Sequence, residues 1–145
     1  MTKNTQNDLF SDSQIFLNYC ELSEPTDYHC HNFIEIAFVA SGTGLHQIAG
    51  YSMPAQAGDI FVICPGVFHQ FSPHPEGLAV YNCVMAPSLF SGVDPFFRSL
   101  KVCENFLHVS FDSFHYPEIF RLYNQMLEEY HGRGFGWQEI LKGCL

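Results

Sequence analysis

Short apolar segments, each closed after a few residues by Gly, Pro, Ser or Asp, constrain the fold of this chain more than any other feature. The segments are IFLNYC, FIEIAFVA, LHQIA, DIFVIC, VFHQF and LAVYNCVMA. This spacing predicts the strands of an antiparallel sandwich or barrel. FIEIAFVA (33–40) is apolar on both faces, so we expect it to lie between two packed layers. A chain of 145 residues with 47% hydrophobic content can bury one such core.

Glycine-containing turns are expected between these strands. Ser41–Gly44, Gly50 and Gly58 each offer backbone that tolerates positive φ, which predicts a tight turn at each place. Pro54 cannot donate a ladder hydrogen bond, so the short segment around it is expected at an edge or at a strand end. The region therefore predicts a series of hairpins.

The pattern changes to a helical period after residue 112. Pro117 is a favourable first helical residue, and the apolar positions that follow recur with the spacing of one amphipathic helix. Those positions are Ile119, Phe120, Tyr123, Met126, Leu127 and Tyr130. Glycines at 132, 134 and 136 end this helix, and a second one is expected from Trp137 onward.

The chain is thus expected to contain three parts. Residues 1–14 are polar and predict a flexible amino-terminal arm, 15–112 predict the barrel, and 113–145 predict a helical segment. The second helix is still running at Leu145, from which we expect the chain to be a fragment that continues into a further part.

Charge and composition exclude several functions. The net charge is −9 with six Lys and Arg, so this segment itself is not expected to contact DNA, RNA or an anionic membrane. We find neither a signal peptide nor an apolar stretch of membrane-spanning length, which favours a soluble cytoplasmic protein. The six cysteines form no CxxC pair, and we expect free thiols that mostly fill the core.

The stretch HCHNFIEIAFVASG (29–42) carries the residues most suited to chemistry. Alternation on a strand places His29, His31 and Glu35 on one face. A straight strand would separate His31 from Glu35 by roughly 13 Å, too far for both to bind one ion. Shared coordination therefore predicts a bend at Asn32 and Phe33.

His69, in GDIFVICPGVFH, supplies a fourth donor after a turn at Pro65–Gly66. Three imidazoles and one carboxylate, from His29, His31, Glu35 and His69, suit Zn, Ni, Fe or Mn. The alternative is a network in which the four side chains hydrogen-bond to one another and to backbone groups without an ion. Either arrangement would line a pocket.

At these residues the sequence resembles the cupin family. His29, His31, Glu35 and Gly42 follow the spacing of its first motif, and Gly58, Gly66 and His69 follow that of the second, over roughly residues 15–87. The chain departs from the pattern at Ser23, Pro65 and Pro73. The resemblance implies a mostly β fold, a cupin-like double-stranded β-helix barrel or jelly roll followed by carboxy-terminal α-helices.

The finer resemblance is to the amino-terminal domain of AraC-type transcription regulators. It lies in HCHNFIEIAFVASGTG, AGDIFVICPGVFHQF and MAPSLF. The resemblance implies an effector-binding barrel, often for a sugar, a helical dimerisation element, and a helix-turn-helix DNA-binding domain that this chain lacks. DNA would then be contacted only through that missing part, and the chain would form a homodimer.

Two further sets of residues are assigned to these roles. His46 and Tyr81 are predicted to join the four donors in binding the effector, although a hairpin histidine and a core tyrosine are the alternatives. The helical face is expected to pack on the barrel and also to serve dimerisation. That face comprises Ile119, Tyr123, Met126, Leu127 and Tyr130.

The sequence therefore predicts a sensor rather than an enzyme: a barrel that binds a small molecule, expected to be a sugar, and controls an attached DNA-binding domain. No cofactor is required, although a divalent transition metal fits the four donors. The competing hypothesis is a metal-dependent cupin enzyme, an oxygenase or a sugar-phosphate isomerase.

Overall fold

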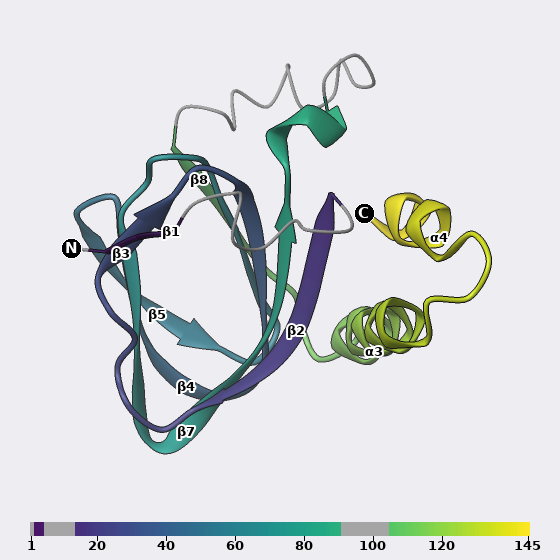
Figure 1. Cartoon of the computed structure of the whole chain (residues 1–145). Coiled ribbons are helices and arrows are strands. Elements are labelled where there is room, and N and C mark those ends of the chain that lie inside the picture. The colour runs from purple at the N-terminus through teal and green to yellow at the C-terminus, as the bar shows by residue number, and fades with distance from the viewer. Residues whose placement is uncertain (1, 5–13, 91–104) are drawn as a thin grey trace.

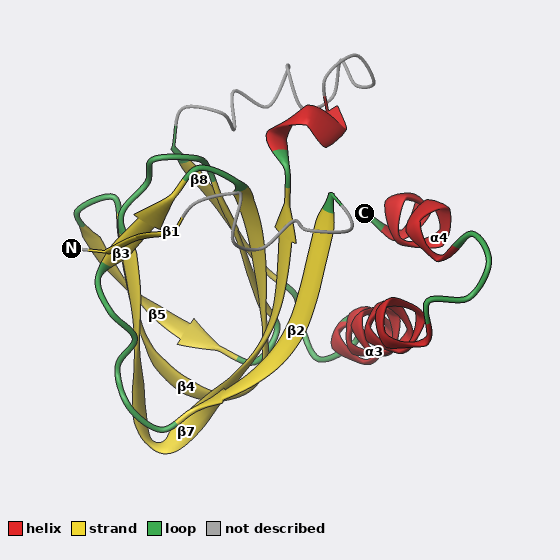
Figure 2. Ribbon diagram, in the orientation of Figure 1, coloured by secondary structure: helices red, strands yellow, loops and turns green. Residues whose placement is uncertain are grey.

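The structure, a computed structural model, describes residues 2–4, 14–90 and 105–145. Strands dominate it, and two α-helices follow them at the carboxy-terminal end (Figure 2). The strands are β1 (Thr2–Asn4), β2 (Ile15–Leu22), β3 (His29–His31), β4 (Ile34–Ile48), β5 (Tyr51–Gln56), β6 (Asp59–Ile63), β7 (His69–Met85) and β8 (Phe106–Ser110). The helices are the 3-10 turn η1 (Pro87–Phe90), α3 (Tyr116–Gly132) and α4 (Trp137–Cys144).

The strands curl into a barrel built around two long members. The sheet order is β1-β3-β7-β4-β6-β8, with β2 added to β7 and β5 added to β4. β4 and β7 pair in antiparallel register along nearly their whole length. Both α-helices lie on one side of the barrel, beyond β2 (Figure 1). The expected mostly β barrel followed by carboxy-terminal helices is confirmed.

The turn expected at Ser41–Gly44 is wrong. β4 runs through these residues and only shifts its register against β7 twice, between Val39 and Ser41 and between Gly42 and Gly44. A Cβ on Gly42 would lie 2.1 Å from the Gly77 carbonyl oxygen. The glycines therefore allow β4 and β7 to approach closely at two irregularities instead of reversing the chain.

The other turns match the sequence. Ala49 and Gly50 both have positive φ, 51° and 83°, and connect β4 to β5. Gly58, with φ 96°, precedes β6. In the described part of the chain β5, which contains Pro54, pairs with β4 alone and is the expected edge strand.

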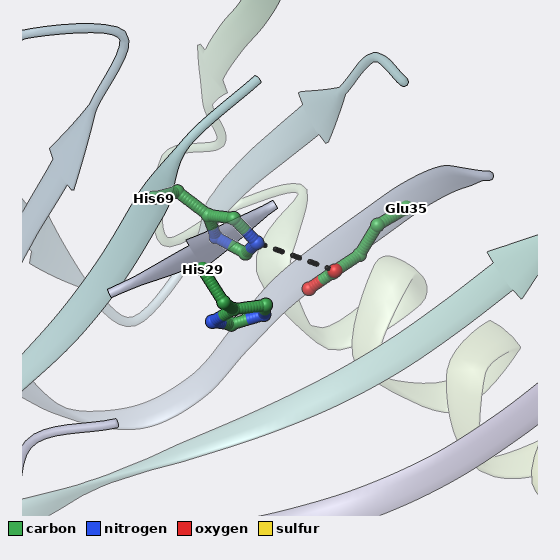
Figure 3. Close-up of side chains that lie close together, drawn as sticks. All are labelled: His29, Glu35 and His69. Carbon is green, nitrogen blue, oxygen red and sulfur yellow. Dashed lines mark ion pairs between the residues drawn. The ribbon is translucent and has the colours of Figure 1, made fainter. Parts of the chain in front are cut away.

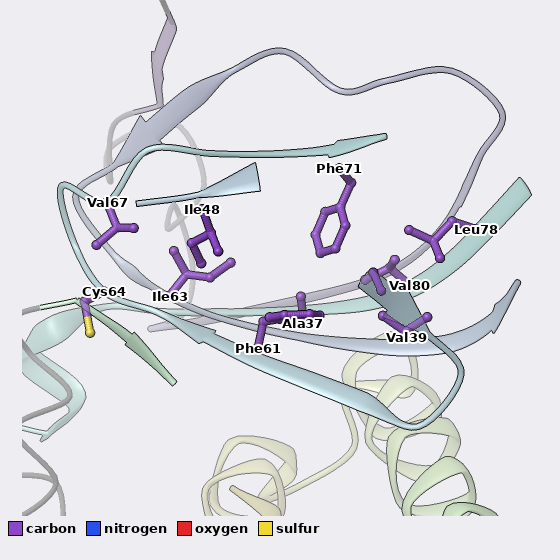
Figure 4. Packing of buried hydrophobic residues seen from close by; sticks show 11 residues of the cluster. Ala37, Val39, Ile48, Phe61, Ile63, Cys64, Val67, Phe71, Leu78 and Val80 are labelled. Carbon is purple, nitrogen blue, oxygen red and sulfur yellow. The ribbon is translucent and has the colours of Figure 1, made fainter. Parts of the chain in front are cut away.

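The segment 33–40 lies between two layers, as its pattern predicted. Ala37 and Val39 face the barrel interior, where they join an apolar cluster (Figure 4). Phe38 and Ala40, on the opposite face, pack beneath α3. The interior cluster comprises Ala37, Val39, Ile48, Ala55, Phe61, Ile63, Cys64, Val67, Phe71, Leu78 and Val80.

The two helices begin close to the predicted positions, at Tyr116 and Trp137. Tyr123 stacks on Phe38 of β4 with ring centroids 4.8 Å apart, and Met126 is 2% exposed. Fully burying an apolar side chain of this size stabilises the fold by roughly 1.5–3 kcal/mol. The apolar face of α3 therefore packs on the sheet, as its spacing predicted.

Three remaining expectations concern the ends, the membrane and the cysteines. β1 pairs in parallel with β3, while the rest of the expected arm, 1 and 5–13, lies outside the described residues. Within the described ranges no helix is long and apolar enough to span a membrane. Cysteines 20, 30, 64, 83 and 144 form no disulfide, and the sixth falls outside those ranges.

Candidate functional site

A bend between two strands assembles the polar group predicted from the sequence. β3 ends at His31, Asn32 and Phe33 form a bend, and β4 begins at Ile34. This is the change of direction that shared coordination required. On the other side His29 pairs directly with His69 at the start of β7. Residues distant in sequence thus meet through strand pairing.

Glu35 lies at the centre of this polar group. Its Oε2 atom is 2.8 Å from Nε2 of His31 and 3.6 Å from Nε2 of His69. His31, Glu35 and His69 are 1%, 5% and 2% exposed, so the group is enclosed by the barrel. Figure 3 shows the side chains of His29, Glu35 and His69 pointing toward one another.

Three of these side chains could hold a metal ion. One ligand atom from each of His29, Glu35 and His69 lies within 4.8 Å of the others. Ligands bound at about 2.1 Å in tetrahedral geometry are about 3.4 Å apart, so small side-chain shifts would close this group around an ion. Imidazole and carboxylate donors of this kind suit Zn, Ni, Fe or Mn.

His31, the fourth predicted donor, lies beside Glu35 but is not one of the three residues whose ligand atoms converge. Its Nδ1 lies 2.9 Å from the Phe33 carbonyl oxygen, which can only accept, so Nδ1–H donates there. The remaining nitrogen, Nε2, is buried and lies 2.8 Å from Oε2 of Glu35. A buried nitrogen in this position suits an additional bound group.

His46 lies behind His69, inside the barrel. Its Nε2 is 3.2 Å from Nδ1 of His69, and its ring stacks on Phe71 at 3.9 Å. It is 0% exposed, which agrees with the prediction that His46 faces inward. The contact fixes the orientation of the His69 ring, as outer partners of metal-binding histidines do.

Burial and charge set the protonation of this group. Burial lowers the pKa of His46 to about 3, assisted by His69, and lowers that of His69 to about 4 against the opposing carboxylate of Glu35. Burial alone would raise the pKa of Glu35, but contact with His31 and the charges of His69, His31 and His29 lower it to about 2. At neutral pH the barrel therefore holds a carboxylate beside neutral His46 and His69.

Tyr81 does not join this group. Its ring packs on the outer face of the sheet against Tyr19, Phe38 and Tyr123. Its hydroxyl donates to Oδ1 of Asn124 on α3. Strand alternation explains the difference, because the neighbouring residue 82 takes the inward direction instead.

The structure adds two residues that sequence reasoning did not select, Asn18 and Asn82. They pair with each other across β2 and β7, and Asn82 also pairs with Ala37 of the interior cluster. Side chains of directly paired residues point to the same face, so both asparagines face inward. Period-two alternation along IFLNYC and LAVYNCVMA was the signal that could have found them.

Several solved structures are similar to this chain at low sequence identity. ToxT K231A from Vibrio cholerae superimposes with a TM-score of 0.57 at 11% identity, over 79% of this chain and 48% of that one. The plu4264 protein from Photorhabdus luminescens gives a TM-score of 0.50 at 18% identity, over 62% and 75%. A cupin 2 conserved barrel domain protein from Salinispora arenicola gives 0.49 at 22% identity, over 55% and 70%.

Fold and site together define a cupin-like barrel domain with an enclosed polar group, as the first resemblance implied. A family model described as the AraC-like ligand binding domain matches residues 20–135. The chain belongs to that family, which confirms the finer resemblance. A comparison with curated proteins gave no match.

Proposed function

We propose that this chain is the sensing domain of an AraC-type transcription regulator and that it binds a small polar effector, a sugar in the first instance, inside the barrel. The effector would contact His29, His31, Glu35, His46 and His69. One observation carries the proposal: this enclosed group has buried polar atoms that nothing in the described chain satisfies. Such a regulator would work in the cytoplasm, where its DNA is.

The energetics of burial favour an occupant. Nε2 of His69 and Nδ1 of His46 are buried without a hydrogen-bond partner among the described residues, and Nε2 of His31 lies 2.8 Å from the Glu35 carboxylate. Each buried polar atom left unpaired costs about 1–3 kcal/mol. A polar molecule that satisfies them would gain affinity from groups that the folded barrel already holds in place.

The strands around the site connect it to both ends of the chain. β3, which carries His29 and His31, pairs with β1 near the amino terminus. β4, which carries Glu35, packs its outer face beneath α3 through Phe38. An effector with different affinities for two arrangements of these strands would shift the arm or the helices, and with them an attached DNA-binding domain.

The helical segment is proposed to serve a homodimer as well. Tyr123 and Met126 are buried against the sheet. Ile119, Leu127 and Tyr130 are half-buried, which leaves part of the same face open to a second copy. A dimer would align two DNA-binding domains with paired half-sites.

Metal binding is a second candidate property, favoured by the convergence of His29, Glu35 and His69. His31 would be the fourth ligand in this arrangement. When bound, the ion would act as a Lewis acid or as an anchor for a polar effector. The sensor does not require it, whereas a metal-dependent oxygenase or isomerase on this barrel would.

A thermal-shift screen tests the proposed function. The chain is melted with a panel of neutral sugars and amino sugars, with and without Zn²⁺, and compared with Glu35→Gln. We expect at least one sugar to raise Tm by several degrees without being consumed, and Glu35→Gln to reduce that shift. Turnover of a substrate that depends on stoichiometric metal would instead establish the enzyme.

A further inference from the structure

Buried polar atoms without a partner among the described residues are also found on asparagines. They are Oδ1 of Asn18, Oδ1 of Asn32 and Oδ1 of Asn82. The Asn18 amide is oriented by its other end, because Nδ2 donates to Sγ of Cys20 at 2.9 Å. Its oxygen is therefore buried without a donor from the described part of the chain.

Asn18, Asn82 and Glu35 form a row across three neighbouring strands. Asn18 of β2 pairs with Asn82 of β7, and Asn82 pairs with Ala37 of β4, two residues from Glu35 on the same face. Diagonal neighbours on one face of a sheet are about 7–8 Å apart. Asn82 is thus a diagonal neighbour of Glu35 on the inner face, and Asn18 lies one strand further along the same line.

Every group in this row accepts hydrogen bonds. The two amide oxygens and the carboxylate have lone pairs to offer, so a ligand must present N–H or O–H donors to them. The strands that line the barrel add a constraint of charge, because β2 to β8 contain neither Lys nor Arg. An anionic effector would meet the buried carboxylate of Glu35, and no cationic side chain of these strands would balance it.

We propose that the effector is a polyhydroxy amine, such as an amino sugar. Its protonated amino group would lie against Glu35, and its hydroxyl groups would donate to Asn82 and Asn18. This inference rests on the proposed function and names the ligand class of the same site. A charge-assisted hydrogen bond to a buried carboxylate is stronger than a neutral one, so the amine is preferred over the hydroxyl compound of the same shape.

The test uses matched pairs of ligands. Glucosamine and glucose, galactosamine and galactose, and mannosamine and mannose are titrated into the chain by calorimetry near neutral pH. In at least one pair we expect the amine to bind about tenfold more tightly than its neutral partner. If no pair favours the amine, the inference is overturned, while a neutral sugar that binds better leaves the proposed function standing.

Variants locate the two contacts separately. Glu35→Gln should abolish the preference for the amine, whereas Glu24→Gln, which removes the same charge from an exposed position, should retain it. Asn82→Ala and Asn18→Ala should weaken both members of the pair about equally, and Gln47→Ala, an exposed amide, should weaken neither.

Two results would contradict these contacts. Unchanged affinity in both asparagine variants would overturn the inference even if Glu35→Gln failed to fold. Stabilisation by ZnCl₂ alone, with no sugar or amino sugar bound in the wild-type chain, would overturn the inference and the proposed function together.

Discussion

His29 and His69 lie directly opposite each other on β3 and β7, with ring centroids 4.5 Å apart. Glu35 reaches the same point from β4, with Oε2 3.6 Å from Nε2 of His69. The polar group is therefore assembled by strand pairing, and its geometry depends on where β3 sits. Because β3 also pairs with β1, a change in this group on effector binding would be transmitted to the amino-terminal strand.

His46 should control how tightly the group holds a metal ion. Because His46 contacts Nδ1 of His69, replacing it with Phe removes the outer partner of a ligand while retaining an aromatic ring against Phe71. We expect Zn²⁺ affinity to fall about 10–100-fold. Competition with a chromophoric chelator measures this. His131→Gln, on the exposed surface of α3, should bind Zn²⁺ like the wild type, and equal affinity in the His46 variant would contradict the assignment.

The buried histidines should make the fold sensitive to acid. The pKa values of His46 and His69 are about 3 and 4 in the folded chain and 6.5 ordinarily. Between pH 6.5 and 4 the unfolded chain therefore binds more protons than the folded one, and the free energy of unfolding falls as pH falls. The slope reaches about 1.4 kcal/mol per pH unit for each histidine.

Urea unfolding at pH 7, 6 and 5 measures that slope. His46→Phe should reduce the slope by the contribution of one histidine, and His131→Gln should leave the slope unchanged. Glu35 acts in the same direction at lower pH, because its stabilising contribution is present above its ordinary pKa of 4.5 and is lost as pH approaches 2. Stability that does not change between pH 7 and 5 would show that His46 and His69 are not buried neutral side chains.

Tyr81→Phe should affect stability and not effector binding. Tyr81 lies on the outer face of the sheet, and its hydroxyl donates a hydrogen bond to the side chain of Asn124 on α3. Its loss should lower the free energy of unfolding by about 1 kcal/mol and leave ligand affinity unchanged. A double-mutant cycle with Asn124→Ala isolates the pair. A large loss of effector affinity with normal stability would return Tyr81 to the binding site.

Gly42→Ala should destabilise the barrel far more than Gly50→Ala. Both glycines have positive φ, 79° and 83°, so an alanine is strained at either position. At Gly42 the new Cβ would also meet the Gly77 carbonyl oxygen at 2.1 Å, whereas at Gly50 nothing lies within 4 Å. Chemical denaturation should show a loss of about 1 kcal/mol for Gly50→Ala and at least twice that for Gly42→Ala. Equal losses would contradict the close approach of β4 and β7.

The sequence predicted the parts of this fold that depend on local periodicity. Both helices and the apolar strand 33–40 were predicted, because burial imposes a period that is visible in one segment. The bend at Asn32–Phe33 followed from the reach of an extended chain. The continuity of β4 through Gly42 could not be predicted, since a glycine suits a tight turn and a close strand crossing equally well.

The site was predicted unevenly for a similar reason. His29, His31, Glu35 and His69 have a recognisable spacing, and the structure places them together. Tyr81 and the inward-facing asparagines depend on which face of a strand points inward, and a shift of one residue reverses that choice. Only the pairing of β2, β7 and β4 fixes the face.

A crystal structure of the chain with a sugar or amino sugar that raises its Tm tests the central claim most directly. The account predicts the ligand inside the barrel, with donors about 2.7–3.2 Å from the Glu35 carboxylate and near the rings of His31 and His69. A hollow of about 460 Å³ lies away from the histidine group, along β2, β4 and β7, and is lined by Glu21, Ser23, Ser41 and Glu76 among others. A ligand bound there, with the histidine group unchanged, would contradict the account.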